Sequence, residues 1–505
     1  MRETPVSQKL DALKAILSEV MDLQHAASLL EWDQQTYMPR AGAEARGHQL
    51  ATLHKLAQVK FTSSEVGQLI ADARSELAGA DAGSDSAALV RVTARDYDKA
   101  VRVPPEFVAR RSVVTAAAHE AWVDARRAAD FGPFRPHLEH ILELVKEYAG
   151  FFPGGAHPYD ALLDDFEPGM RTADVRGIFD ALRPQQVELI KQIRERKPPK
   201  DDFLYGKYDQ NKLIDFAVMV ATDFGYDWSR GRQDRAPHPF ATSFSVDDVR
   251  ITTRFEPQAP INTLFNTFHE SGHGIYEQGI SRTYERSPLK GGCSSALHES
   301  QSRLWENIVG RSLPFWEHYF PKFKQRFAGR LDGVGLKAFH RAINRVQPSF
   351  IRVEADEATY NLHVMLRFEL ELALLEGQLA VKDLPDAWNT RMRDYLGITP
   401  PNDAQGVLQD IHWSGMLFGY FPTYALGNLV SAQLWTKILS EIPDLDGIIR
   451  KGDFAPLREW LRVNLHTFGR KYDPGDLVRR ITGSGIDAAP YMQYLQGKYA
   501  EIYNL

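Results

Sequence analysis

Residues 261–278 read INTLFNTFHESGHGIYEQ. Apolar residues recur through this stretch at helical spacing, which predicts a helix with a broad apolar face. His269 and His273 stand four positions apart, so both imidazoles lie on one face of that helix, one turn from each other. Gly272 and Gly274 each lower helix propensity by about 1 kcal/mol. We interpret these glycines as places where another backbone or a substrate comes close to the helix.

The five residues His269-Glu270-Ser271-Gly272-His273 form a pattern typical of zinc peptidases. Both histidines can bind one ion, whereas Glu270 is rotated about 100° away from them and can reach a metal-bound water instead. The competing interpretation is a buried helix with two hydrogen-bonded histidines. The apolar helical setting favours the metal site, so the pattern predicts a zinc-dependent peptidase with Glu270 as its base.

A catalytic zinc site needs at least one further protein ligand, with a fourth position left open. The amphipathic stretch 296–306, ALHESQSRLWE, predicts a second helix that would supply Glu299. Spacing alone leaves three other carboxylates as candidates: Glu277, Glu285 and Glu306. It also allows Glu299 to be a surface carboxylate paired with Arg303, four positions later.

Most of the remaining chain has helical periodicity. It predicts helices over residues 6–30, 138–148, 175–196, 213–223, 358–375 and 429–442. In residues 238–255, β-branched and aromatic residues flank Asp247-Asp248 and predict two short strands joined by a tight turn, whereas residues 78–86 predict a loop. In the absence of repeats and long linkers, residues 1–505 are expected to form one mainly helical catalytic unit, with about residues 1–100 as a lid.

The composition excludes several classes of protein. The 505 residues are 43% apolar, enough for a large core, and the formal net charge of −6 gives no basic excess for a nucleic-acid surface. Cys293 is the only cysteine, which fits a reducing compartment, and no uncharged run approaches the length of a membrane span. We expect a cytoplasmic protein, and we interpret Cys293 as a small packed thiol because no base motif accompanies it.

Six short blocks occur in order along the chain. They are residues 238–240 (HPF), 248–252 (DVRIT), 269–273 (HESGH), 298–301 (HESQ), 351–356 (IRVEAD) and 406–413 (GVLQDIHW). These blocks match the HPF, DXRXT, HEXXH, HESQ, IRXXAD and GXXQDXHW elements of the carboxypeptidase Taq family. The chain resembles that family over nearly its whole length, from residues 31–33 (EWD) to residues 494–495 (YL).

This resemblance implies a large two-lobed helical metallopeptidase with a deep central groove and a small β-sheet next to the HEXXH helix. It implies an enzyme, commonly a homodimer, that releases single C-terminal amino acids from peptides with broad specificity but not proline. Zn²⁺ is the implied cofactor, and Co²⁺ can substitute for it. The HESQ match makes Glu299 the third metal ligand after His269 and His273, and the HEXXH match makes Glu270 the general base.

A carboxypeptidase has to bind the free C-terminal carboxylate of its substrate. Arginine suits this role because its planar fork donates two parallel hydrogen bonds to a carboxylate. Arg352, in the IRXXAD block, is the candidate, with Asp356 one helical turn later to orient it. The alternative is an internal Arg352–Asp356 ion pair that only shapes a helix.

Other substrate contacts are expected near the metal. By resemblance, His238 and His412 are candidates for substrate binding, with a structural role for each as the alternative. A further donor should stabilise the oxyanion, and the glycine-rich stretch 415–428 offers Tyr420 and Tyr424, which can also simply pack. Residues 250–255 are expected to form a strand whose edge holds the peptide in an extended conformation.

Two other functions share these features. An oligopeptidase would use the same zinc core to cut internal bonds of short peptides. A binding or scaffolding protein with a degenerate site would hydrolyse nothing, even after zinc or cobalt is added. The complete set of ligands and the intact base argue against the degenerate site. The two enzymes differ in their products, which are single C-terminal residues for a carboxypeptidase and internal fragments for an oligopeptidase.

Overall fold

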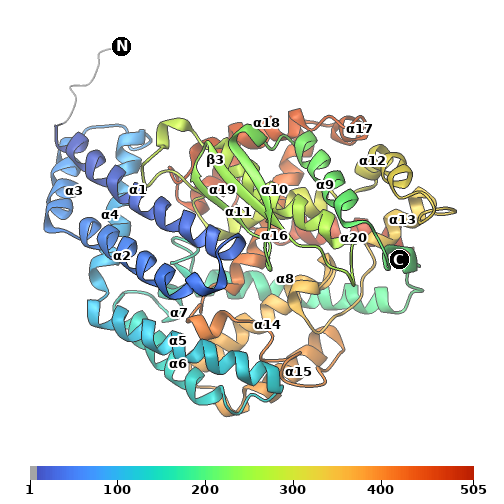
Figure 1. Cartoon of the computed structure of the whole chain (residues 1–505), viewed down its shortest axis with the longest axis horizontal. Coiled ribbons are helices and arrows are strands. Elements are labelled where there is room, and N and C mark those ends of the chain that lie inside the picture. The colour runs from blue at the N-terminus through green and yellow to red at the C-terminus, as the bar shows by residue number, and fades with distance from the viewer. Residues whose placement is uncertain (1–7) are drawn as a thin grey trace.

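Helices dominate the structure, as the periodicity predicts (Figure 1). The computed structural model describes residues 8–505, and the predicted start of the first helix at Val6 lies outside them. The helices are α1 Gln8–Thr36, α2 Ala43–Phe61, α3 Ser64–Glu76, α4 Asp85–Arg102, α5 Pro105–Ala128, α6 Arg135–Gly150, α7 Tyr159–Leu163, α8 Thr172–Arg194, α9 Gln210–Phe224, α10 Asn262–Gly279, α11 Ser295–Arg303, α12 Leu313–Arg326, α13 Leu336–Ile343, α14 Glu357–Leu375, α15 Leu384–Leu396, α16 Phe421–Glu441, α17 Leu445–Arg450, α18 Ala455–Asn464, α19 Pro474–Thr482 and α20 Ala489–Tyr503.

Each helix predicted from the sequence is present. The predicted segments fall in α1, α6, α8, α9, α10, α11, α14 and α16, and the predicted loop lies between α3 and α4, although α4 already begins at Asp85. The stretch that follows α11, Leu304–Val309, continues as a π-helix. Between residues 8 and 505, no helix is both long enough and apolar enough to cross a membrane.

A small three-stranded sheet lies beside α10. Its strands are β1 Gly231–Arg235, β2 Ala241–Ser245 and β3 Asp248–Thr253, in the order β1-β3-β2. β2 and β3 are antiparallel and form the predicted pair, whereas β1 is parallel to β3 and was not predicted because its sequence, GRQDR, is almost entirely polar. Since β3 is the central strand, the expectation that residues 250–255 offer a free edge is wrong; the outer strands are β1 and β2.

Buried apolar residues form two hydrophobic cores. One core contains residues of the sheet, α9, α10, α12 and α18, and the other contains residues of α5, α6, α8, α14, α15 and α20. α16 contributes Val430 and Leu434 to the first core and Leu426 and Leu429 to the second, which explains why most of its residues are buried. Because α11 packs against both α10 and α16, it lies at the boundary of the two cores.

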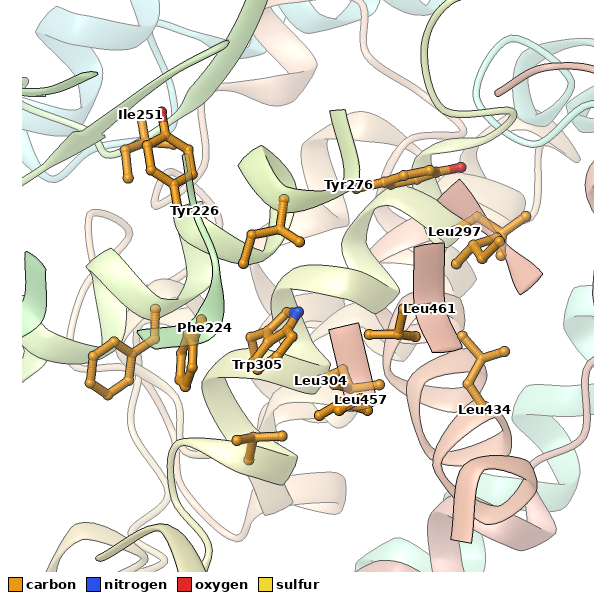
Figure 2. Packing of buried hydrophobic residues seen from close by; sticks show 14 of the residues in the cluster. Phe224, Tyr226, Ile251, Tyr276, Leu297, Leu304, Trp305, Leu434, Leu457 and Leu461 are labelled. Carbon is orange, nitrogen blue, oxygen red and sulfur yellow. The ribbon is translucent and has the colours of Figure 1, made fainter. Parts of the chain in front are cut away.

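Aromatic side chains fix the position of α10 in the first core (Figure 2). The ring of Phe224 lies 4.4 Å from that of Trp305 and 5.5 Å from that of Phe268, between centroids. On the opposite side, Tyr226 lies next to Ile251 of β3, and both are buried (Figure 2). α10 is therefore held between the sheet and the segment that follows α11.

The two glycines of α10 lie where neighbouring groups leave no room for a side chain. A Cβ atom on Gly272 would stand 2.6 Å from the carbonyl oxygen of Gln301 and 2.7 Å from Cα of Ser302, both in α11. A Cβ atom on Gly274 would stand 2.5 Å from the ring of Tyr226. Gly272 thus allows the backbones of α10 and α11 to approach each other, as the sequence predicts.

Candidate metal centre and active site

Two helices bring three ligand side chains to one point. His269 and His273 on α10 and Glu299 on α11 each offer one atom, and these atoms lie within 4.8 Å of one another. Oε2 of Glu299 is 3.6 Å from Nε2 of His269 and 3.4 Å from Nε2 of His273. Ligand atoms about 2.1 Å from a tetrahedral zinc ion are about 3.4 Å apart, so these separations fit such an ion.

The two carboxylate oxygens of Glu299 have different partners. Oε2 faces the histidines, while Oε1 accepts a hydrogen bond of 2.7 Å from Nε of Arg303. The side chain is buried, so it is not the surface carboxylate of the competing interpretation, although the ion pair with Arg303 exists. Arg303 therefore holds the oxygen that faces away from the histidines.

Glu270 is buried one position after His269, and its Oε2 atom has no hydrogen-bond partner among the described residues. Burial is the main reason that the pKa of Glu270 is raised, to about 7, and Glu299 and Glu306 add to the shift. A carboxyl group with a pKa near neutrality can both accept and return a proton.

Glu306, one of the rival carboxylates, lies behind His269. Its Oε2 atom is 2.8 Å from Nδ1 of His269, so this nitrogen donates its proton to the carboxylate and Nε2 remains free. Burial opposes the charge on Glu306, but Arg303, His269 and Arg311 together lower its pKa to about 2. Burial also disfavours the charged form of His269 and by itself would lower its pKa. The neighbouring carboxylates outweigh burial, so the pKa of His269 is raised.

A chain of three side chains lies behind His273. Nδ1 of His273 is 2.6 Å from Nδ1 of His298, and Nε2 of His298 is 2.9 Å from Oε1 of Glu277. Because the carboxylate accepts the proton of Nε2, His298 accepts at Nδ1 from His273, whose Nε2 atom is left free. Burial lowers the pKa of His273 to about 4, so the ring is neutral at pH 7. Glu285, the remaining rival, instead accepts from the backbone N–H of Val246.

This donor set suits a divalent metal. Both histidines donate through Nδ1 to an outer partner, which leaves two Nε2 lone pairs and one carboxylate oxygen pointing at the same place. Two nitrogens and one oxygen in this arrangement match a catalytic zinc site with an open position. The unpartnered Oε2 atom of Glu270 would then be available to accept a hydrogen bond from a water molecule at that open position.

Arg352 is buried, and its guanidinium group is held from two sides. Nη2 donates to Oδ1 of Asp410 at 2.9 Å, and Nη1 donates to the hydroxyl of Tyr360 at 2.8 Å. Asp356 takes no part, because its carboxylate caps α14 by accepting from two backbone N–H groups at 3.0 Å each. Both the expected support from Asp356 and the alternative Arg352–Asp356 pair are therefore wrong; Arg352 lies in a separate 3₁₀ turn, Arg352–Glu354, and not on α14.

His412, Tyr420 and Tyr424 lie together beside Arg352. Nε2 of His412 is 3.3 Å from the hydroxyl of Tyr424, and its ring centroid is 5.6 Å from that of Tyr420. The guanidinium carbon of Arg352 is 4.8 Å from the ring centroid of Tyr424. Burial raises the pKa of both tyrosines and the charge of Glu299 adds to the shift, so both hydroxyls are neutral donors within electrostatic reach of the metal ligands.

Two predicted positions lie apart from this group. His238 is exposed on the segment between β1 and β2, and within the described chain no hydrogen bond or ion pair joins it to the other candidates. Cys293 is buried just before α11, and burial raises the pKa of its thiol to about 12. The thiol is therefore protonated at neutral pH, as expected for a packed cysteine.

Two residues that connect the halves of the site, Tyr360 and Asp410, were not predicted as part of it. Arg303, whose pairing with Glu299 the sequence allowed, stacks on Tyr360 with its guanidinium carbon 4.3 Å from the ring centroid. Tyr360 in turn accepts a hydrogen bond from Arg352, and Asp410 binds both Arg352 and Arg367. Asp410 had a signal, because it stands in the GXXQDXHW block, whereas an isolated tyrosine inside a helical pattern has none.

Comparison with known proteins identifies the family. The profile of the carboxypeptidase Taq (M32) metallopeptidase family matches residues 12–499. This chain belongs to that family. As an M32 protein it is a metallocarboxypeptidase, and the family implies a bound metal.

Relatives of this M32 protein match it from end to end. It is 40% identical over 495 residues to thermostable carboxypeptidase 1 of Thermus thermophilus, covering 96% of this chain and 97% of the relative. It is 36% identical over 491 residues to carboxypeptidase 1 of Bacillus subtilis, covering 97% and 98%. The crystal structure of the M32 carboxypeptidase from Deinococcus radiodurans R1 matches with a TM-score of 0.95 and 40% identity, covering 99% of this chain and all of that one.

Proposed function

We propose that this protein is a zinc carboxypeptidase that releases single C-terminal amino acids from peptides, with broad specificity but not proline. The observation that carries the proposal is the convergence of His269, His273 and Glu299 beside the unpartnered oxygen of Glu270. Carboxypeptidases are also the relatives that match over the whole chain. We propose Zn²⁺ as the native ion and Co²⁺ as a working substitute, because two imidazoles and a carboxylate suit both.

The protonation of Glu270 supports its role as general base. When bound, the metal polarises the scissile carbonyl and makes the attacking water more acidic. Glu270 accepts the proton of that water and then donates it to the nitrogen of the departing amino acid. Burial raises the pKa of Glu270, which makes its carboxylate a stronger base for the first transfer.

The hydroxyls of Tyr420 and Tyr424 are the proposed donors to the oxyanion. Their raised pKa values keep both protonated, and a neutral hydroxyl in a buried site stabilises developing negative charge without a reorganisation cost. His412, bonded to Tyr424, would orient that hydroxyl and contact the substrate. His238 is proposed as an outer contact of the peptide, since it is exposed next to β2.

Arg352 is the proposed binder of the C-terminal carboxylate. Asp410 and Tyr360 fix its guanidinium group in one orientation, so little side-chain entropy is lost when a carboxylate binds. Asp410 also accepts from Arg367, so two cations share one carboxylate and leave net positive charge at this end of the site. That excess charge favours an incoming carboxylate.

The remaining proposals concern the whole protein. We propose that it works in the cytoplasm, that residues 1–505 act as one catalytic unit with α1–α4 as a lid over a central groove, and that it forms a homodimer. Light scattering coupled to size-exclusion chromatography measures the oligomeric state directly. A monomeric mass across the working concentration range would refute the homodimer.

Product analysis tests the proposed activity. The zinc-loaded protein is incubated with a blocked dipeptide and with a longer peptide, and the products are identified by mass spectrometry, with Glu270→Gln as the blank. Stepwise loss of single C-terminal residues is expected. Internal fragments would instead establish an oligopeptidase. The absence of hydrolysis with either zinc or cobalt would support a binding or scaffolding protein with a degenerate site.

A further inference from the structure

We propose that a basic cleft along α4 binds a small phosphorylated molecule. The cleft has a volume of about 330 Å³, and none of the proposed metal ligands or substrate contacts lines it. Five of its lining side chains are cations: Arg74, Arg91, Arg95, Lys99 and Arg102. Two are acids, Asp98 and Asp164, so the cleft carries a net positive charge in a protein whose own net charge is −6.

The sequence of α4 places these cations on one face. Arg91, Arg95, Lys99 and Arg102 follow one another at spacings of four, four and three residues, so their side chains leave the helix on the same side. Like charges at this spacing destabilise a helix slightly unless an anion neutralises them. The arrangement therefore favours a negatively charged partner.

Only the inner end of the cleft is neutralised. Arg95 donates to Oδ2 of Asp164 at 3.0 Å, and Lys99 lies 2.9 Å from the same oxygen and also pairs with Asp165. Arg74 and Arg102 form the outer end of the cleft. Among the described residues, none accepts a hydrogen bond from either guanidinium group or forms an ion pair with it. Both side chains are exposed, so two free guanidinium groups border the same hollow.

The cleft lies between elements that belong to different hydrophobic cores. α4 contributes Val90 and Val92 to the first hydrophobic core, whereas Leu162 and Leu163, just before Asp164, belong to the second. The ion pairs of Arg95 and Lys99 thus link an element of the first core to a segment next to the second. A hollow between two such bodies is a common place for a ligand site.

The chemistry of the cleft favours phosphate over other anions. A guanidinium group matches two phosphate oxygens at once, and two of them can bind one phosphate group from both sides. The volume is near the lower end of the range for small-molecule sites, so it suits a phosphate ester of about nucleotide size rather than a macromolecule. The ring of Phe152 lines the cleft as an apolar wall, which would suit the organic part of such an ester.

Titration of the zinc-loaded protein tests this site. Binding of inorganic phosphate and of adenosine 5′-monophosphate is measured by calorimetry at constant ionic strength, in the unmodified protein and in Arg74→Gln/Arg102→Gln. Because both arginines are exposed, the double variant is expected to fold normally, and its circular dichroism spectrum verifies this. The matched control is Arg127→Gln, an exposed arginine at the end of α5, outside the cleft.

We expect the unmodified protein and Arg127→Gln to bind at least one of the two probes with a dissociation constant of about 1 mM or lower. In the double variant this dissociation constant should rise about tenfold or more. Tighter binding of the nucleotide than of inorganic phosphate would identify an organic phosphate as the ligand, and equal affinities would identify free phosphate. The proposal is overturned if neither probe binds, or if the double variant binds as tightly as the unmodified protein, which would place the anion elsewhere, for example at the metal. Because the readout is binding and not hydrolysis, this result is independent of the proposed activity.

Discussion

At the scale of single residues, each proposed metal ligand is held by a second side chain. Glu306 holds His269, His298 holds His273, and Arg303 holds Glu299. These outer bonds decide which atom of each ligand is free, because a histidine that donates through Nδ1 can bind a metal only through Nε2. The chemistry of the site thus depends on residues that would never touch the metal.

Glu270→Gln should abolish proton transfer while leaving the metal in place. The amide has nearly the same shape but cannot accept the proton of the attacking water, so kcat is expected to fall about 10²- to 10⁴-fold. Metal content, measured by plasma mass spectrometry, should be unchanged, since Glu270 is not among the three grouped ligands. Retention of most activity in the metal-loaded variant would rule out Glu270 as the base.

Arg352→Ala should weaken recognition of a free C-terminus. Loss of a charge-assisted interaction costs about 1.5 to 3 kcal/mol, which corresponds to roughly 10- to 150-fold in kcat/KM. A substrate with an amidated C-terminus never makes this contact, so the variant should process it almost as well as the unmodified enzyme does. Equal losses on both substrates would show that Arg352 only supports the fold through Asp410, and thermal unfolding of the variant would then show the lost stability.

At the scale of helices and strands, the site depends on how closely α10 and α11 approach each other. Gly272→Ala should push the two apart, because the new methyl group would overlap the backbone of α11 at Gln301 and Ser302. Overpacking of this kind costs about 1 to 3 kcal/mol of unfolding free energy. Since α11 carries Glu299, zinc affinity should fall as well.

Gly177→Ala is the matched control for that substitution. Gly177 lies within α8, and a Cβ atom there meets nothing within 4 Å. Alanine should therefore stabilise the protein by up to about 1 kcal/mol through helix propensity alone, with no effect on zinc affinity. Chemical denaturation and zinc titration of both variants provide the comparison, and similar effects at the two positions would contradict the close-approach argument.

The sequence predicts local geometry better than contacts between distant elements. His269, His273 and Gly272 could be interpreted from one helix, because their spacing alone sets where they point. Asp356 was wrongly paired with Arg352 because it is near in sequence, whereas the true partner, Asp410, is 58 positions away. β1 was not predicted because it too depends on a contact with another element. Its polar residues form a strand because β3 lies beside them.

At the scale of the whole molecule, buried carboxylates should make the protein sensitive to acid. Burial alone would raise the pKa of Glu277, but His298 and Lys290 outweigh it and lower the pKa to about 2. A carboxyl group whose pKa is lowered in the folded state stabilises the fold fully above its unfolded pKa, about 4.3, and loses this contribution as the pH falls towards 2. Glu277 is expected to contribute about 3 kcal/mol by this route.

Denaturation of the metal-free protein between pH 7 and pH 3 measures that contribution. The stability difference between the unmodified protein and Glu277→Gln should shrink as the pH falls below about 4.3, because the unfolded chain then takes up a proton at Glu277 while the folded carboxylate stays charged down to about pH 2. A difference that stays constant over the range would mean that the charge of Glu277 does not stabilise the fold.

Removal of the metal should abolish activity but leave the helices intact. The two hydrophobic cores are built without the three ligands, so circular dichroism after treatment with a chelator should change little. The melting temperature should fall modestly, because a ligand that binds only the folded state stabilises it. Added Zn²⁺ or Co²⁺ should restore hydrolysis, and loss of helical signal on chelation would contradict this account.

Glu306 and His298 accept hydrogen bonds from the two histidine ligands, and Arg303 donates one to Glu299, so the fold itself orients all three side chains. One divalent ion can then replace another in the folded enzyme, at a rate set by the dissociation of the ion that is already bound. We expect such a site to discriminate weakly between Zn²⁺ and Co²⁺, so the abundance of each ion in the growth medium should influence which one is incorporated. Two batches with identical sequence, grown on different trace elements, should therefore differ in specific activity and become equal after dialysis against the same salt.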